Sequence, residues 1–295
     1  MNSVVARPDF VVIGAMKCAT STLHHQLSRQ PGLFLSQPKE PNFFSDDDVF
    51  SNGPAWYRGL FREAVPGTLR GEASTHYTKL PSYPKTVKRM TALFPDLKLL
   101  YLMRHPMARL ISHYRHDRNV GAITCGIEEA VEGHSPLLDS GRYAYQLTPY
   151  LEAFGPDQIL PIFFDRLVHA PREEVERIGR FLGVPGKLTW DTSLKPQHVT
   201  SDRLKRSPLL EALVRAPVLT PLRQRLLPKA LSEPIKGLLK ENPETPVISP
   251  EFAERLADVF DADLDHLGEW LGIDLNCENF SNATRDSAIE WNVKG

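Results

Sequence analysis

A lysine and three consecutive hydroxyl side chains follow a short apolar run near the start of the chain. The run, residues 10–13, ends at Gly14, and Lys17 comes before an apolar helical pattern. The hydroxyl side chains are those of Thr20, Ser21 and Thr22. A strand, a tight loop and a helix in this order direct backbone N–H groups and the positive end of the helix dipole at one point. With the charge of Lys17 added, the segment predicts a site for an oxyanion such as phosphate or sulfate.

The same segment differs from the phosphate-binding loop of ATPases and GTPases. That loop has the pattern G-x-x-x-x-G-K-[ST], with the lysine just before the helix. Here Lys17 follows Gly14 after two residues, and the chain contains no Gly-Lys-Ser or Gly-Lys-Thr. Nor does an evident second aspartate stand at a strand end to hold magnesium. A P-loop kinase or NTPase is therefore the weaker interpretation, kept as an alternative.

An arginine and a serine form a second candidate anion site. Arg104 directly follows the apolar run of residues 98–103, and Ser112 comes eight positions later, beyond Pro106. Proline favours the first turn of a helix, so Ser112 is expected about two turns into one. In an open parallel sheet, ligands bind at the carboxyl ends of the strands. At such an end Arg104 offers two parallel N–H donors to a phosphate, and Ser112 offers a hydroxyl.

Alternating apolar runs and helical patterns predict the scaffold that positions these residues. Short apolar runs bounded by glycine, proline or charge predict strands at residues 9–13, 68–71, 98–103 and 158–164. Helical patterns occur at residues 22–30, 83–93, 106–119, 143–154, 172–182 and 250–271. Continuously apolar strands suit a parallel sheet covered on both faces. The expected class is α/β, with a doubly wound central parallel sheet flanked by helices and right-handed crossovers.

Composition and charge indicate an ordinary globular enzyme. The 295 residues carry a formal net charge of -1 and are 41% hydrophobic, with 3 cysteines. No basic excess points to nucleic acid, and no apolar run approaches the roughly 20 residues that span a bilayer. The cysteines suggest neither a disulfide framework nor a zinc site. The N-terminus lacks a signal-peptide pattern, so a cytoplasmic location is expected.

The last third of the chain has a different pattern. Residues 195–240 are rich in Lys and Arg and are interrupted by prolines. This stretch is either a loop that closes over an anionic ligand or a solvated surface region. Residues 250–271 carry an apolar stripe at helical spacing. A single domain over 1–295 is expected, with a core at about 9–190 and a C-terminal basic loop and helical segment at about 191–295.

In their order along the chain, these motifs resemble those of sulfotransferases that use 3′-phosphoadenosine 5′-phosphosulfate (PAPS). That family has a lysine followed by Thr/Ser on its phosphate-binding loop, and an arginine with a serine eight positions on. Three further segments resemble its carbohydrate, heparan-type branch: residues 39–44 (K-E-P-N-F-F), 71–77 (G-E-A-S-T-H-Y) and 141–145 (G-R-Y-A-Y). The resemblance runs from about residue 9 to 184 and implies the P-loop NTPase-like sulfotransferase fold.

The resemblance implies PAPS as the sulfuryl donor, adenosine 3′,5′-bisphosphate (PAP) as the product, and no metal. Lys17 would neutralise charge on the bridging oxygen and the transferred group. Arg104 and Ser112 would hold the 3′-phosphate. The loop that would cradle the 5′-phosphate comprises Lys17, Cys18, Ala19, Thr20, Ser21 and Thr22.

Three further positions of the site leave alternatives open. Cys18 is either a thiol whose pKa the anion site lowers or a small residue that fills the loop. Tyr143 either contacts the nucleotide or packs in the core at a helix start. In relatives a late basic loop closes on the 3′-phosphate, which makes Arg203 a candidate, with Lys205 and Arg206 as alternatives.

The base that takes the acceptor's proton has two candidates. Glu40 matches the glutamate of the heparan-type K-E-x-x-F-F stretch, although composition alone favours a surface carboxylate paired with Lys39. His76 is the second candidate, because an unperturbed imidazole has a pKa of about 6.5. The chain departs from the family at two positions. It has Ala19 where the family often has a glycine, and Ala73 where the family often has a lysine, so one expected positive charge is unaccounted for.

The expected activity is transfer of a sulfuryl group from PAPS to a hydroxyl, or an amine, of a carbohydrate or other natural product. The alternatives are a P-loop kinase or NTPase, and a non-catalytic module that binds PAP. The partner is a small-molecule or glycan acceptor whose identity is open, as is the oligomeric state. Neither a nucleic-acid partner nor a membrane span is expected.

Overall fold

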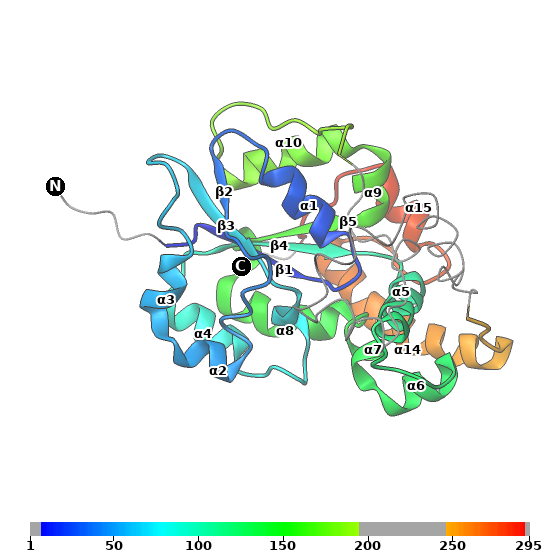
Figure 1. Ribbon diagram of the computed structural model, residues 1–295. Coiled ribbons are helices and arrows are strands. Elements are labelled where there is room, and N and C mark those ends of the chain that lie inside the picture. The colour runs from blue at the N-terminus through cyan, green and yellow to red at the C-terminus, as the bar shows by residue number, and fades with distance from the viewer. Residues whose placement is uncertain (1–6, 195–245, 293–295) are drawn as a thin grey trace, which may run out of the picture.

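A five-stranded parallel sheet forms the centre of the molecule (Figure 1). The computed structural model describes residues 7–194 and 246–292. The strands lie in the order β2-β3-β1-β4-β5, each parallel to its neighbours. Their bounds are β1 Phe10–Gly14, β2 Leu33–Leu35, β3 Leu69–Ala73, β4 Lys98–Met103 and β5 Ile159–Phe163. Because all five strands run the same way, their carboxyl ends meet at one edge of the sheet.

Helices cover both faces of this sheet. Helices α1 (Thr20–Leu27) and α10 (Pro171–Leu182) lie on one face, and α4 (Thr86–Leu93) and α8 (Tyr143–Phe154) on the other (Figure 1). The remaining elements are α2 (Asp47–Ser51), α3 (Gly53–Gly59), η1 (Thr75–Thr78), α5 (Pro106–Asn119), α6 (Ile127–Gly133), α7 (Ser135–Asp139), η2 (Pro156–Gln158), α9 (Phe164–His169), α14 (Pro250–Leu271) and α15 (Phe280–Arg285). The doubly wound architecture expected from the sequence is confirmed. No helix in the described ranges is long and apolar enough to cross a membrane.

Strands β1, β4 and β5 are largely apolar and buried, because helices cover both faces of the sheet. Every residue of β1 and β5 is buried, and so is every residue of β4 after Lys98. On β3, Gly71 leaves room for the ring of Phe10, which would lie 2.2 Å from a Cβ at this position. Burial of one large apolar side chain contributes about 2 kcal/mol, so these strands form a firm base for the loops at their ends.

Helix α14 stabilises the start of α8. Asp263 of α14 accepts hydrogen bonds from the N–H groups of Ala144 and Tyr145, both at 2.9 Å. The first N–H groups of a helix have no partner within it, and the helix dipole favours an anion at that end. Burial raises the pKa of the Asp263 carboxyl, while these two N–H groups favour its charge. The C-terminal part of the chain thereby holds Tyr143, the first residue of α8.

The structure adds one strand and shifts several helix ends relative to the sequence-based expectations. Strand β2 was not predicted, because its three residues are too few to show a periodicity. The four predicted strands are present, with ends shifted by at most two residues. Helix α1 begins at Thr20 rather than at residue 22, so all three hydroxyl side chains belong to its first turn. The basic stretch of residues 195–240 lies outside the described residues.

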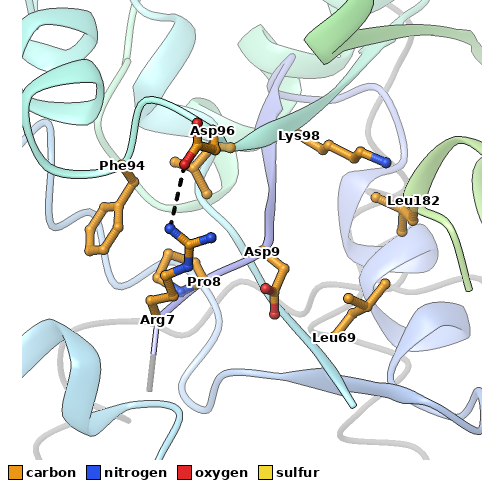
Figure 2. A pocket seen from close by; sticks show the side chains of 9 residues that line it. Arg7, Pro8, Asp9, Leu69, Phe94, Asp96, Lys98 and Leu182 are labelled. Carbon is orange, nitrogen blue, oxygen red and sulfur yellow. Dashed lines mark ion pairs between the residues drawn. The ribbon is translucent and has the colours of Figure 1, made fainter. Parts of the chain in front are cut away.

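A cavity of about 180 Å³ lies at the opposite, amino-terminal edge of the sheet (Figure 2). Its charged side chains bond to the protein itself. Arg7 pairs with Asp96 at 3.6 Å, and Lys98 donates to the carbonyl of Phe181 at 2.6 Å. Asp9 accepts the N–H of Arg70 at 2.7 Å. The charged side chains that line the cavity therefore connect the strand starts to their surroundings. The cavity lies away from the predicted site.

Candidate active site

The loop with Lys17 lies at the carboxyl end of β1 and leads directly into α1. Lys17 and Ala19 have φ angles of 70° and 67°, in the left-handed region that favours glycine. Successive residues in such conformations turn their N–H groups toward one side, where an anion binds. Among the described residues, no side chain caps the start of α1, which is the end of a helix where anions bind. The loop has the form of an anion cradle, with Ala19 in a conformation that a glycine would adopt more easily.

Beneath this loop, β1 and η1 are in close contact. Thr78 Oγ1 donates to the carbonyl of Ile13 at 2.9 Å. The same oxygen would lie 2.0 Å from a Cβ at Gly14. Gly14 is therefore required by the close approach of η1 to the end of β1. This contact also brings the segment after β3 next to the Lys17 loop.

Cys18 is buried below the loop and does not have the properties of a reactive thiol. Its side chain is fully buried, with Sγ 3.8 Å from the hydroxyl of Tyr143. Burial raises the pKa of the Cys18 thiol to about 11, against the smaller opposing effect of Arg109. Of the two interpretations offered by the sequence, the structure favours the small residue that fills the space under the cradle.

Arg104 follows β4 directly and lies at the same edge as the Lys17 loop, because β1 and β4 are neighbours. Its guanidinium carbon lies 4.7 Å from the centre of the Phe164 ring, at the start of α9. Stacking on an aromatic face limits the orientations of a guanidinium. Ser112 is half-buried in the second turn of α5, which begins at Pro106 as predicted.

Tyr143 is fully buried and bonds to the backbone of Arg104. Its hydroxyl donates to the Arg104 carbonyl and accepts the Arg104 N–H at 3.1 Å. Of the two interpretations offered by the sequence, the structure favours packing in the core. Tyr143 thus positions Arg104, and the hydroxyl is engaged there rather than exposed toward a nucleotide.

Glu40 lies in the loop after β2, against the carboxyl end of β3. Its N–H donates to the carbonyl of Ala73 at 2.9 Å, and its φ is 61°. One carboxylate oxygen pairs with Lys39, and the other accepts the hydroxyl of Thr75 at 3.4 Å. Burial alone would raise the pKa of Glu40, but the charge of Lys39 and then its hydrogen bond hold it below its ordinary value. The carboxylate is ionised near neutral pH and half-buried at the edge of the sheet.

His76 lies on η1, close enough to Glu40 for their charges to interact. Its ring stacks on Tyr83, with centres 4.9 Å apart and planes 16° apart. Burial, followed by the charge of Lys79, lowers the pKa of His76 to about 4. The imidazole does not have the pKa near neutrality that made it attractive as a base, because it is desolvated beside a cation.

A buried carboxyl group supports the loop that carries Glu40. Glu72 is fully buried and accepts hydroxyl hydrogen bonds from Tyr57 at 3.1 Å, Tyr77 at 2.6 Å and Ser74 at 2.8 Å. Ser74 Oγ in turn accepts the N–H of Asn42 at 3.1 Å. Burial raises the pKa of Glu72 to about 7, partly offset by these hydroxyl groups. The network ties the loop after β2 to β3.

Sequence reasoning missed a polar cluster on α5. His113 Nδ1 lies 3.3 Å from a guanidinium nitrogen of Arg109, and His113 Nε2 lies 3.3 Å from a carboxylate oxygen of Asp117. Burial and then the charges of Arg109, Lys79 and Lys17 lower the pKa of His113 to about 2. The four-residue spacing of Arg109, His113 and Asp117 was the signal, since it places side chains on one face of a helix.

His24 on α1 was also missed. Its side chain is buried, and Nε2 has no hydrogen-bond partner among the described residues. Burial, followed by Lys39, lowers the pKa of His24 to about 4. His24 is therefore a neutral imidazole close enough to Lys39 for the lysine charge to affect it.

Comparisons with known proteins agree with this fold. A model of the Sulfotransferase family matches residues 52–189. Heparan sulfate glucosamine 3-O-sulfotransferase 3B1 of Mus musculus is 31% identical over 194 residues, which are 62% of this chain and 47% of that protein. A sulfotransferase from Alicyclobacillus acidocaldarius, known from its crystal structure, is 25% identical, covers 92% of this chain and 98% of its own, and has a TM-score of 0.67. The matched segment belongs to the sulfotransferase family, and the chain has the sulfotransferase fold.

A more distant similarity points to the same branch of sulfotransferases. Bifunctional heparan sulfate N-deacetylase/N-sulfotransferase 1 of Caenorhabditis elegans is 27% identical over 195 residues, or 60% of this chain and 22% of that protein. The chain spans about half the length of the first curated relatives it matches. The resemblance to PAPS-dependent sulfotransferases, and to their heparan sulfate branch, is thus confirmed together with the fold.

In this sulfotransferase fold, the residues predicted from the motifs gather at one edge. Lys17 follows β1 and Arg104 follows β4, while Glu40 follows β2 and His76 follows β3. These four strands are neighbours in the sheet. Arg203 lies outside the described residues. Within residues 7–194 and 246–292, no group of three or more His, Cys, Asp or Glu could hold a metal ion. The individual roles of these residues stay predictions.

Proposed function

We propose that the protein transfers a sulfuryl group from PAPS to a hydroxyl group of a carbohydrate or a related natural product. The observation that carries this proposal is the arrangement at the carboxyl edge. The anion cradle with Lys17 lies between Arg104, after one neighbouring strand, and Glu40, beside the end of the other. Two cationic groups flanked by an ionised carboxylate suit a donor with two anionic ends and an acceptor that must lose a proton.

The residues present fit a PAPS donor and a PAP product. In this proposal the loop N–H groups and Lys17 bind the 5′-phosphosulfate end, as expected at an uncapped helix start. Arg104 and Ser112 bind the 3′-phosphate, with Arg104 oriented by Phe164. The match to the sulfotransferase family supports the same donor.

Glu40 is proposed as the base that receives the proton of the acceptor hydroxyl. As the acceptor oxygen forms its bond to sulfur, the bond from sulfur to the bridging oxygen of PAPS breaks and PAP leaves. Lys17 neutralises the negative charge that grows on that bridging oxygen. Glu40 is preferred over His76 because it is held against β3 by its own N–H and is ionised near neutral pH.

The acceptor is proposed from the relatives. Proteins named for O-sulfation and for N-sulfation of heparan sulfate both resemble this chain. These names support a sugar acceptor and favour a hydroxyl, since the 3-O-sulfotransferase 3B1 is 31% identical and the N-sulfotransferase 27%. An amine acceptor is the alternative outcome of the test below. The cytoplasmic location and the single-domain organisation stay predictions.

Binding and transfer assays test the proposal. Calorimetry is expected to detect PAP binding and no binding of Mg-ATP. Labelled sulfate from PAPS is then offered to a panel of glucosamine-containing oligosaccharides, simple alcohols and amines, and transfer to a sugar hydroxyl is expected. Magnesium-dependent ATP turnover would instead indicate a kinase or NTPase. PAP binding without transfer to any acceptor would indicate a non-catalytic binding module.

A further inference from the structure

Lys79 lies directly after η1, and its backbone is held on both sides. The preceding residue, Thr78, donates to the carbonyl of Ile13 at the end of β1. The N–H and carbonyl of the next residue, Leu80, both bond to the side-chain amide of Gln146, at 2.8 Å and 3.0 Å. The Lys79 side chain therefore starts from a fixed point beside the Lys17 loop.

The charge of Lys79 acts on groups at both sides of this edge. It favours the ionised forms of Glu40, after β2, and of Asp117, on α5. It also disfavours protonation of His113 on α5. Lys17 acts on the same two residues of α5, Asp117 and His113. The two ammonium groups thus share an environment, and Lys79 extends it toward Glu40.

The neighbouring carboxylates do not form an ion pair with Lys79. Glu40 pairs with Lys39, and Asp117 lies 3.3 Å from the ring of His113, which is neutral because its pKa is lowered to about 2. Within the described part of the chain, Lys79 has no ion pair of its own. Its side chain is half-buried, and burial lowers the pKa of Lys79. The charges of Glu40 and Asp117 act on Lys79 without an ion pair at contact distance. A partly desolvated cation of this kind gains from direct contact with an anionic ligand, so this position favours a bound anion.

We propose that Lys79 contacts the terminal oxygens of the sulfuryl group, as a second catalytic cation beside Lys17. The inference rests on the proposed function. In the transfer, negative charge is spread over the terminal oxygens as well as the bridging oxygen, and prepositioned charges stabilise it better than water does. Lys17 comes from the loop at the helix start, on the side of the donor phosphate. Lys79 comes from the segment next to Glu40, on the side where the acceptor is deprotonated.

The substitution Lys79→Met tests this contact because it keeps the length of the side chain and removes the charge. Lys88→Met, at an exposed lysine of α4, is the matched control, and Lys79→Arg tests rescue by charge. Calorimetry measures PAP and PAPS binding for each variant, and transfer is measured with an acceptor that the wild type uses. Retained PAP binding also shows that a variant is folded.

For Lys79→Met, PAP affinity is expected to stay unchanged. A fall in PAPS affinity of about tenfold, as expected for the loss of one charge-assisted contact, supports the proposal. A fall in turnover of about 100-fold supports it equally. Lys79→Arg is expected to recover most of the loss, and Lys88→Met to behave as wild type. If Lys79→Met keeps both its PAPS affinity and its turnover, or loses PAP affinity equally, the proposal is overturned. A wild type that binds neither PAP nor PAPS refutes the proposed function itself, before any variant is compared.

Discussion

The hydroxyl of Tyr143 bonds to both backbone polar groups of Arg104. It donates to the Arg104 carbonyl and accepts the Arg104 N–H, while its oxygen lies 3.8 Å from Cys18 Sγ under the Lys17 loop. One buried side chain from the start of α8 therefore contacts both proposed anion-binding segments. Asp263 holds the start of α8 in turn, so the distance between the two segments depends on the C-terminal helix α14.

Tyr143→Phe is expected to weaken PAP binding about tenfold and to lower the free energy of unfolding by about 1–3 kcal/mol. The substitution leaves the N–H and carbonyl of Arg104 without their partner in a partly buried place. Calorimetry and urea unfolding measure the two effects. Tyr145→Phe, two residues along the same helix, is the control and should keep both values. Wild-type PAP affinity in the Tyr143 variant would mean that Arg104 is positioned without it.

Removal of the two proposed anion-binding cations should affect different steps. Lys17→Ala is expected to abolish detectable transfer, because the charge on the leaving oxygen is no longer neutralised. Arg104→Ala is expected to weaken PAP binding by about 10- to 100-fold, as the loss of charge-assisted hydrogen bonds predicts. Arg180→Ala, at an exposed position of α10, should change neither value. Unchanged turnover in the Lys17 variant would refute its proposed role.

The two candidate bases are separated by parallel substitutions. Glu40→Gln is expected to bind PAP normally and to lose turnover by about 10²- to 10⁴-fold, the usual effect of removing a general base. His76→Ala is expected to keep most of its turnover. Single-turnover kinetics with saturating PAPS measure the chemical step, and Glu63→Gln at an exposed position is the control. Loss of that step only in the His76 variant would transfer the role to the imidazole.

The pH dependence of turnover follows from the lowered pKa of Glu40. A base must be unprotonated, so turnover should be level around neutral pH and fall only below about pH 4.5, the ordinary value for this carboxyl. Lys39→Met removes the largest effect that lowers the pKa of Glu40, so the acid limb should move to higher pH. The kcat profile of the two proteins is the measurement. Identical acid limbs would show that the measured group is not Glu40.

Glu72 should make the protein less stable as the pH rises. Its folded-state pKa is about 7 against an ordinary value of 4.5. Between these two values the native carboxyl retains a proton that the unfolded chain has lost, so stability decreases over this pH window. Above pH 7, the free energy of unfolding is expected to be about 3 kcal/mol lower than at a pH below 4.5. Urea unfolding at pH 5 and pH 8 should show this loss in the wild type.

Glu72→Gln removes the titrating group and should remove that part of the pH dependence. The exposed Glu63→Gln variant should behave as the wild type does. If Glu72→Gln loses as much stability between pH 5 and pH 8 as the wild type, another group is responsible.

The sequence alone determined the strand and helix order and the positions of the main motifs. The apolar runs that became β1 and β4, and the lysine and arginine that follow them, are local features, since continuous burial and the ends of strands leave a direct trace in the residue types. The proline at the start of α5 had the same local character. Strand β2 left no such trace, because three residues show no period.

Only the tertiary structure decided the environment of the charged groups. The sequence suggested Glu40 and His76 as bases, but their pKa values depend on Lys39 and Lys79 and on the burial that packing produces. The networks around Glu72 and Tyr143 join residues from different strands and helices, and hydrogen bonds of that kind have no periodicity in the chain. Local pattern therefore determined which groups reach the carboxyl edge. Their charge and orientation there arise from long-range contacts, because desolvation and Coulomb interactions depend on distance in space.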